Sequence, residues 1–155
     1  MSTDAEFLNQ AVNLAMANVI EQGGRPFGAV LVKDGEVIAS GVNEIGVTGD
    51  PTAHAELSAM RKAAQVLGTP RLDGCVVYAS GQPCPMCLAA MHMTGVRAVR
   101  YCYSNADGEP FGLSTAPVYA QMAKPLAEQA IDIRHDPVGA AGAPLYAAWK
   151  ARQIT

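Results

Sequence analysis

Two short runs of the sequence hold side chains that could bind a metal ion and move protons. The first is His54-x-Glu56 and the second is Cys84-x-x-Cys87. Both stand where helices are predicted to begin, and unpaired backbone N–H groups there favour thiolates. The cysteine pair holds two sulfurs about one helical turn apart. Together with one histidine nitrogen these sulfurs make three ligands for Zn²⁺, which prefers a tetrahedron, so the fourth place would hold water.

Glu56 is the candidate for proton transfer. A carboxylate two residues from the histidine could reach the water without ligating the metal, and could shuttle its proton. Two residues so spaced on an ideal helix differ by roughly 200° in direction. His54 and Glu56 therefore converge only if the first turn is irregular or if the metal lies over the helix end, and the sequence leaves both arrangements open.

Taken alone, the Cys84/Cys87 pair suits three classes of protein. These are a hydrolytic zinc enzyme, a dithiol oxidoreductase and a zinc-stabilised binding module. Redox chemistry gives no role to His54 and Glu56, and a closed structural site would want a fourth Cys or His nearby. The combination of the two runs therefore favours a catalytic site with one zinc ion per chain.

The composition bounds the rest of the interpretation. The chain has 155 residues, a formal net charge of −3 and a sequence pI near 5.5, which suits one domain over 1–155 and disfavours a dedicated nucleic-acid binder. It has no apolar run of about 18 residues, and acids stand near the N-terminus where a secretory signal carries bases. We expect a cytoplasmic protein in which Cys75 and Cys102, both in apolar strand-like runs, are core thiols.

The predicted elements form a scaffold for both runs. A capped amphipathic helix precedes a hairpin whose Asp34-Gly35 turn supplies positive φ angles, and helices then alternate with buried strands. This order predicts an α/β fold, a three-layer αβα sandwich with a mixed five-stranded sheet and helices on both faces. The expected helices cover 4–22, about 53–67, 84–93, a short stretch from 118 and 145–152, and the expected strands 29–32, 37–39, 75–79, 96–103 and 131–133.

Four stretches of the sequence carry a resemblance to a known family. They are Pro26-Phe27-Gly28-Ala29, Asn43, Asp50-Pro51-Thr52-Ala53-His54-Ala55-Glu56 and Pro83-Cys84-Pro85-Met86-Cys87-Leu88. The pattern His-x-Glu followed by Pro-Cys-x-x-Cys is typical of zinc nucleobase deaminases. Over roughly its first 100 residues the chain resembles the cytidine-deaminase superfamily, and within it the bacterial guanine deaminases and tRNA adenosine deaminases.

The resemblance implies a reaction and a role for each residue of the centre. His54, Cys84 and Cys87 would bind zinc, and Glu56 would shuttle a proton while water replaces an exocyclic amine of a small nitrogen heterocycle and ammonia leaves. Asn43 matches the asparagine whose amide recognises the ring edge of the substrate.

Four further residues are expected to contact the substrate. Phe27 matches an aromatic side chain that lines the pocket, and Ala55 stands between the metal ligand and the acid. Phe111 lies in a Gly- and Pro-rich loop that could close over a ligand. Met93 stands near the end of the cysteine helix, where the family usually carries an aromatic pair.

The chain departs from the family pattern at several places. The loop 112–115 lacks the carboxylate that guanine deaminases carry there, although Asp107 and Glu109 precede it in the same loop and could substitute, and Gln82 replaces a common Glu. A guanine-like purine, as base or nucleoside, is the first expectation for the substrate. Cytosine or cytidine, ammeline or another aminated heterocycle are the alternatives.

The expected partners are small. Residues 96–155 hold six Lys and Arg against five Asp and Glu, so the chain lacks the basic tail of a tRNA-editing enzyme, and tRNA is not expected as a substrate. Apolar helices with few charges favour a homodimer. The segment 139–155, which begins with a Gly/Ala/Pro linker at 139–144, could be exchanged between subunits.

Overall fold

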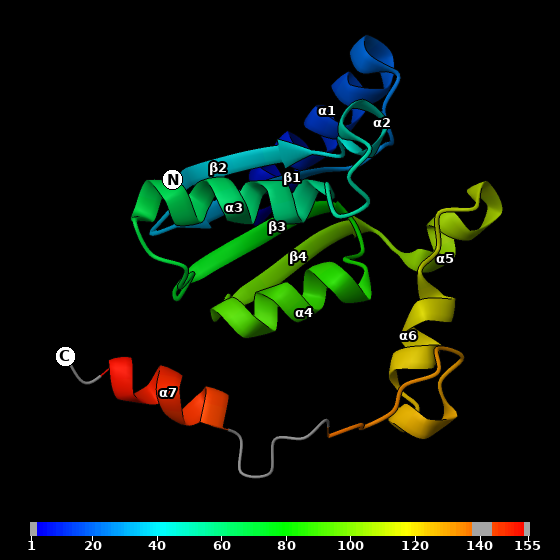
Figure 1. The fold of residues 1–155 in the computed structure, drawn as a ribbon. Coiled ribbons are helices and arrows are strands. Elements are labelled where there is room, and N and C mark those ends of the chain that lie inside the picture. The colour runs from blue at the N-terminus through cyan, green and yellow to red at the C-terminus, as the bar shows by residue number, and fades with distance from the viewer. Residues whose placement is uncertain (1–2, 138–143, 154–155) are drawn as a thin grey trace. The chain divides into compact units, whose positions relative to one another are not determined.

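The computed structural model describes residues 3–137 and 144–153 (Figure 1). The chain falls into two compact units, 1–120 and 121–155. The first unit contains the sheet, the helices that cover it and all the residues expected at the catalytic centre. No helix in the described ranges is long and apolar enough to cross a membrane.

A four-stranded mixed sheet forms the middle of the first unit. Its order is β2-β1-β3-β4; β1 is antiparallel to both β2 and β3, and β3 is parallel to β4. The hairpin between β1 and β2 turns at Asp34 and Gly35, whose φ angles of 51° and 78° confirm the predicted turn. The strands are β1 (Gly28–Lys33), β2 (Glu36–Val42), β3 (Cys75–Gly81) and β4 (Ala98–Tyr103).

Helices cover both faces of this sheet, as predicted. On one face lies α1, Asp4–Gln22, which begins at a capping box between Thr3 and Glu6. On the other face lie α3, Ala55–Leu67, and α4, Pro85–Thr94, which are seen in front of the strands in Figure 1. The shorter helices are α2 (Ile45–Thr48), α5 (Asn105–Gly108), α6 (Ala116–Met122) and α7 (Pro144–Arg152), with 3₁₀ turns at Glu109–Phe111 and Leu126–Glu128.

Alternating residues of the strands divide the core into two layers. Ala29 and Leu31 of β1 pack with α3 and α4, whereas Val30 and Val32 pack with Phe7 of α1. This alternation follows from the period of two along a strand, which sends successive side chains to opposite faces. The layer under α3 and α4 contains both cysteines of the Cys84-x-x-Cys87 run. The metal-binding side chains therefore rest on the buried core.

Glycines let two helices approach the sheet closely. A Cβ at Gly41 of β2 would stand 2.5 Å from the carbonyl oxygen of Ala55 and 2.8 Å from the amide nitrogen of Ala59, both in the backbone of α3. A Cβ at Gly28 of β1 would meet the carbonyl oxygen of Ala11 in α1 in the same way. Gly41 thus sets the depth at which α3 lies on the sheet.

Two expectations about strands are wrong. The predicted fifth strand at 131–133 is not formed, and Ile131 is 72% exposed. A short apolar run becomes a strand only when a neighbouring strand supplies hydrogen-bond partners, and the described residues supply none to this run. Cys102, expected in the core, is exposed because β4 is an edge strand with its last four residues exposed, whereas Cys75 is fully buried as predicted.

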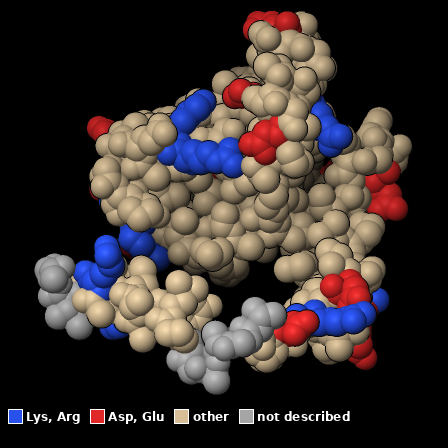
Figure 2. Space-filling view, in the orientation of Figure 1, with Lys and Arg blue, Asp and Glu red and all other residues tan. Residues whose placement is uncertain are grey.

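Charged side chains are sparse on the face that α3 and α4 present. Figure 2 shows this face mostly free of Lys, Arg, Asp and Glu, apart from a short row of basic side chains and a few acids. The low charged fraction of 16% over the whole chain accounts for the pattern. Apolar Met86 and Met93 of α4 are exposed at 36% and 80%.

Candidate metal centre and active site

The three expected metal ligands stand at or just inside the starts of two helices. His54 is the N-cap of α3 and Cys84 is the N-cap of α4, both with extended backbone angles. An N-cap residue is not yet helical, so the 200° separation of an ideal helix does not apply between His54 and Glu56. The first turn of α3 is regular, because Ser58 N–H donates to the His54 carbonyl oxygen at 2.9 Å, so of the two arrangements that the sequence left open the structure has the one with the ligand at the helix end.

The ligand atoms have the spacing of a tetrahedral zinc site. The Nδ1 atom of His54 lies 3.4 Å from Sγ of Cys84 and 3.6 Å from Sγ of Cys87, and all three atoms lie within 4.8 Å of one another. Zinc at the usual Zn–N and Zn–S bond lengths would separate a nitrogen from a sulfur by roughly 3.6 Å. One histidine nitrogen and two sulfurs are also a donor set that zinc prefers. The residues present fit zinc in both spacing and chemistry.

Hydrogen bonds among the ligands prepare one thiolate. The pKa of Cys84 is lowered to about 4, because its sulfur accepts hydrogen bonds from the Cys87 thiol, from His54 and from the Cys87 backbone N–H at 3.4 Å. The same contact with Cys84 raises the pKa of Cys87, and the hydrogen bond to Cys84 raises that of His54. Zinc needs both sulfurs as thiolates and an unprotonated Nδ1, so metal binding would displace the protons on Cys87 and on Nδ1 of His54.

Glu56 is buried beside the ligands. Its exposed fraction is 6%, and burial raises the pKa of its carboxyl group. Desolvation has this effect because it penalises the charged form. A carboxyl group with a raised pKa accepts a proton more readily than a solvated one, which suits a group that takes up and returns a proton.

A cavity of about 180 Å³ opens beside these groups. Of the residues expected to contact substrate, it is lined by Phe27, Asn43 and Ala55, together with His54, Glu56 and Cys84 of the proposed centre. These six come from four separate parts of the chain: the motif before β1, the residue after β2, the start of α3 and the start of α4. The structure therefore brings most of the expected site residues around one space.

Asn43 offers a hydrogen-bond donor to this cavity. It is buried, with an exposed fraction of 5%, and its Oδ1 accepts from the backbone N–H of Ile45 at 3.1 Å. That bond fixes the orientation of the amide and leaves Nδ2 for a ligand, because a backbone N–H needs an acceptor. The backbone around Asn43 is held as well, by its own N–H to Phe27 O and by Asn18 Nδ2 to its carbonyl.

Other lining residues had not been assigned to the site from the sequence. Arg25, Gln82, Ser114 and Thr115 border the same cavity. Arg25 and Gln82 each immediately precede a proline of the recognised motifs, at Pro26 and Pro83, and that adjacency was a usable signal. Ser114 and Thr115 lie in the loop 112–115, which the resemblance had marked as the place of a missing carboxylate, although no role had been assigned to these two side chains.

The two loop carboxylates considered as substitutes are placed elsewhere. Asp107 caps α5 by accepting from Ser104 N at 2.8 Å and Ser104 Oγ at 3.0 Å, and these bonds lower its pKa. It lines a different, larger cavity, and Glu109 lines neither. In the structure Glu56 is the one carboxylate among the residues lining the smaller cavity.

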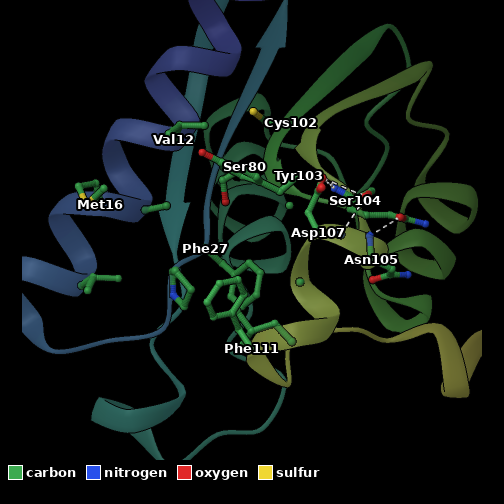
Figure 3. Close-up of a pocket in the computed structure, with 17 residues that line it drawn as sticks. Val12, Met16, Phe27, Ser80, Cys102, Tyr103, Ser104, Asn105, Asp107 and Phe111 are labelled. Carbon is green, nitrogen blue, oxygen red and sulfur yellow. Dashed lines mark hydrogen bonds between the residues drawn. The ribbon is translucent and has the colours of Figure 1, made fainter.

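The larger cavity, of about 650 Å³, lies between α1 and the loop after β4 (Figure 3). Val12 and Met16 lie on one side and Phe111 lies near Phe27, which lines both cavities. Phe111 is thus placed in this space and is 77% exposed. Met93, at the far end of α4 and 80% exposed, lines neither cavity.

Relatives with assigned activities match most of the chain. It is 46% identical over 125 residues to a guanine deaminase of Bacillus subtilis, which covers 81% of this chain and 80% of that protein. It is 39% identical over 93 residues to a tRNA-specific adenosine deaminase of Aquifex aeolicus, which covers 60% of this chain and 61% of that one.

Solved structures agree with these matches. The X-ray structure of the Bacillus subtilis guanine deaminase superposes with a TM-score of 0.85 at 38% identity, covering 100% of this chain and 96% of that one. A guanine deaminase from Nitrosomonas europaea superposes with a TM-score of 0.70 at 28% identity, covering 76% and 68%. The family model of the cytidine and deoxycytidylate deaminase zinc-binding region matches residues 1–103, a range that contains the whole zinc centre. The chain is a member of this family of zinc-dependent hydrolytic deaminases.

Proposed function

We propose that this deaminase removes the exocyclic amine of a guanine-like purine and releases ammonia. The observation that carries the proposal is the placement of buried Glu56 and the Asn43 amide around one small cavity next to His54 and Cys84. The similarity to two guanine deaminases supports a purine, and the tRNA adenosine deaminase covers less of the chain.

Each residue has a task in this reaction. His54, Cys84 and Cys87 would hold zinc, which when bound supplies a Lewis acid that makes water nucleophilic near neutral pH. Glu56 takes a proton from the attacking water and delivers it to a ring nitrogen; it then takes the proton of the newly added hydroxyl group and delivers it to the amine, which leaves as ammonia while the ring carbonyl forms. Asn43 donates from Nδ2 to an acceptor on the ring edge and so orients the carbon that is attacked.

Release of ammonia from a panel of bases tests the proposal. Zinc-loaded protein would be incubated with guanine, guanosine, cytosine, cytidine, adenosine and ammeline, with metal content measured on the same sample. We expect about one zinc per chain and turnover of guanine. If the protein turned over only cytosine or ammeline, the proposed substrate would be wrong, but the proposed deamination chemistry would stand. Silence across the panel in a zinc-loaded sample would favour a binding role.

A homodimer is proposed as the working form. Apolar side chains are exposed on α4, at Met86 and Met93, and on the edge strand, at Tyr101 and Tyr103. In the second unit the helix α7 exposes Leu145, Tyr146 and Trp149. Such surfaces commonly mark interfaces. Sedimentation should give twice the chain mass, and a monomer at micromolar concentration would contradict this.

Exchange of the segment 139–155 between the two chains remains part of this proposal. The residues 138–143, which would form the hinge of the exchange, lie outside the described residues. The helix α7 that follows is described and carries no buried residue. Chains mixed with and without an isotope label would report the exchange through cross-links that join α7 to the other chain.

A further inference from the structure

Three polar side chains around the smaller cavity share one feature: a backbone N–H occupies their acceptor oxygen. The Oδ1 atom of Asn43 accepts from Ile45 N at 3.1 Å, Oε1 of Gln82 accepts from Asn105 N at 2.9 Å, and Oγ of Ser114 accepts from Ala116 N at 3.2 Å. Each of these three residues lines the cavity. Each oxygen keeps a second lone pair, and each side chain also has a donor to offer a ligand: Nδ2, Nε2 or the hydroxyl hydrogen.

Arg25 adds a positively charged donor to the same wall. It lines the cavity, and its charge is felt at the His54 ring. Within residues 3–137 and 144–153 its guanidinium has no ion-pair or hydrogen-bond partner. Arginine offers only donors, up to five of them in a fixed fork.

Acceptors are correspondingly few in this cavity. Glu56 is its one carboxylate, and the hydroxyl of Thr115 lies 3.4 Å from Oδ1 of Asn105, to which it donates. Gln82 adds a donor here, since its Oε1 accepts from Asn105 N–H and its Nε2 remains for a ligand. Hydrogen-bond donors therefore predominate among the polar side chains that line this cavity.

We infer that Gln82, Ser114 and Arg25 determine substrate specificity, acting with Asn43 to select a ring that carries an oxo group over the same ring carrying an amino group at that position. The inference rests on the proposed function and extends it to residues outside the recognised motifs. An oxo group at that position accepts from these donors. An amino group there sets donor against donor and leaves both unpaired, which costs binding energy.

A pair of purines isolates this selection. Guanine and 2,6-diaminopurine share the 2-amino group and differ in oxo against amino at position 6, together with the proton that guanine carries on the adjacent N1. Binding would be measured by equilibrium dialysis on the full zinc-loaded chain carrying Glu56→Gln, so that bound bases are not turned over. We expect this parent to bind guanine at least tenfold more tightly than 2,6-diaminopurine, because a satisfied hydrogen bond replaces a mismatched one.

The substitutions are chosen to separate donation from loop structure. Gln82→Glu keeps an acceptor for Asn105 N–H but removes the spare donor, so the preference for guanine should fall about tenfold while zinc content and thermal midpoint stay unchanged. Ser114→Ala and Arg25→Met should each lower the preference as well. The matched controls Gln65→Glu and Arg61→Met make the same chemical changes at exposed positions of α3 that line neither cavity.

Each outcome decides something. A guanine preference that stays within twofold of the parent in all three cavity variants would overturn the inference, and so would a parent that binds neither purine. A purely structural role for Gln82 predicts that Gln82→Glu behaves like the parent, which would remove Gln82 from the set. Ammonia release by the unsubstituted chain is measured separately. If the chain releases none while the variants still shift the binding preference, the proposed function fails and the inference stands.

Discussion

The Nδ1 atom of His54 lies 3.4 Å from the Sγ atom of Cys84, although thirty residues separate the two in the sequence. His54 is the N-cap of α3 and Cys84 is the N-cap of α4, and both helices pack on the same face of the sheet. The two caps meet because both helices begin at the same end of the sheet, as Figure 1 shows. The metal centre is thus a consequence of how two helices are aligned, and it should respond to changes in either one.

Replacing Cys84 tests the metal centre directly. Cys84→Ala removes one of three protein ligands, and with it the acceptor for Cys87 N–H. We expect zinc content to fall from about one per chain to near zero after dialysis, because two protein ligands rarely retain zinc. Elemental analysis measures this. Cys102→Ala, at an exposed position away from the ligands, is the control and should keep its zinc. Full zinc occupancy in Cys84→Ala would contradict the assignment.

The role of Glu56 is tested without disturbing the ligands. Glu56→Gln has nearly the same volume but cannot accept and return a proton, so zinc should stay bound while deamination falls by about two to four orders of magnitude. Ammonia release and metal content on the same preparation give both numbers. Glu44→Gln, which lines neither cavity, makes the same change elsewhere and should leave the rate unaltered. Ordinary turnover by Glu56→Gln would exclude it as the proton shuttle.

Local signals in the sequence were sufficient for most of the fold. The capping box of Thr3 and Glu6 and the turn at Asp34-Gly35 depend on neighbours within three residues, and both were predicted. The prediction of a strand at 131–133 was wrong because a strand depends on a partner strand that the local sequence does not specify. The prediction that Cys102 is buried was wrong for a related reason, since an apolar run does not reveal which strand lies at the edge of the sheet.

The site was predictable only where a motif carried it. His54, Glu56, Cys84 and Cys87 belong to one family pattern, so their meeting could be expected before the structure was known. Ser114 comes to the cavity through the path of a loop, and that path depends on bonds such as Asn105 N to Gln82 Oε1. Side chains that reach a site only through tertiary contacts have no characteristic spacing along the sequence by which they could be recognised.

The close approach of α3 to the sheet at Gly41 gives a stability prediction. In Gly41→Ala the new methyl group would stand 2.5 Å from the Ala55 carbonyl oxygen, so α3 must move outward. We expect a loss of about 1–3 kcal/mol in the free energy of unfolding, the usual range for an overpacked core. Zinc affinity should fall as well, since His54 begins this helix.

Urea unfolding and a zinc-binding titration measure the two effects of Gly41→Ala. Gly46→Ala is the control, because a Cβ there meets nothing within 4 Å and the backbone needs no positive φ. Equal stability of the two variants would show that α3 has room to shift without cost. Loss of stability without loss of zinc affinity would separate the packing of the helix from the position of its cap.

The last prediction concerns high pH and a contact far from the metal centre. The hydroxyl of Tyr78 donates to Oδ1 of Asp4, and burial together with this bond raises the pKa of Tyr78 to about 12. An unfolded tyrosine ionises near pH 10. The folded state therefore favours the protonated phenol, so the contribution of this phenol to the free energy of unfolding is fully present below about pH 10 and is lost as the pH rises from about 10 to about 12.

Tyr78→Phe has no such proton to lose, so its unfolding free energy should decline less over this interval. Urea unfolding at pH 8 and pH 11 measures the difference, with Tyr146→Phe on exposed α7 as the control. If Tyr78→Phe and the unsubstituted chain lose the same stability between these two pH values, then Tyr78 does not hold its proton through the bond to Asp4.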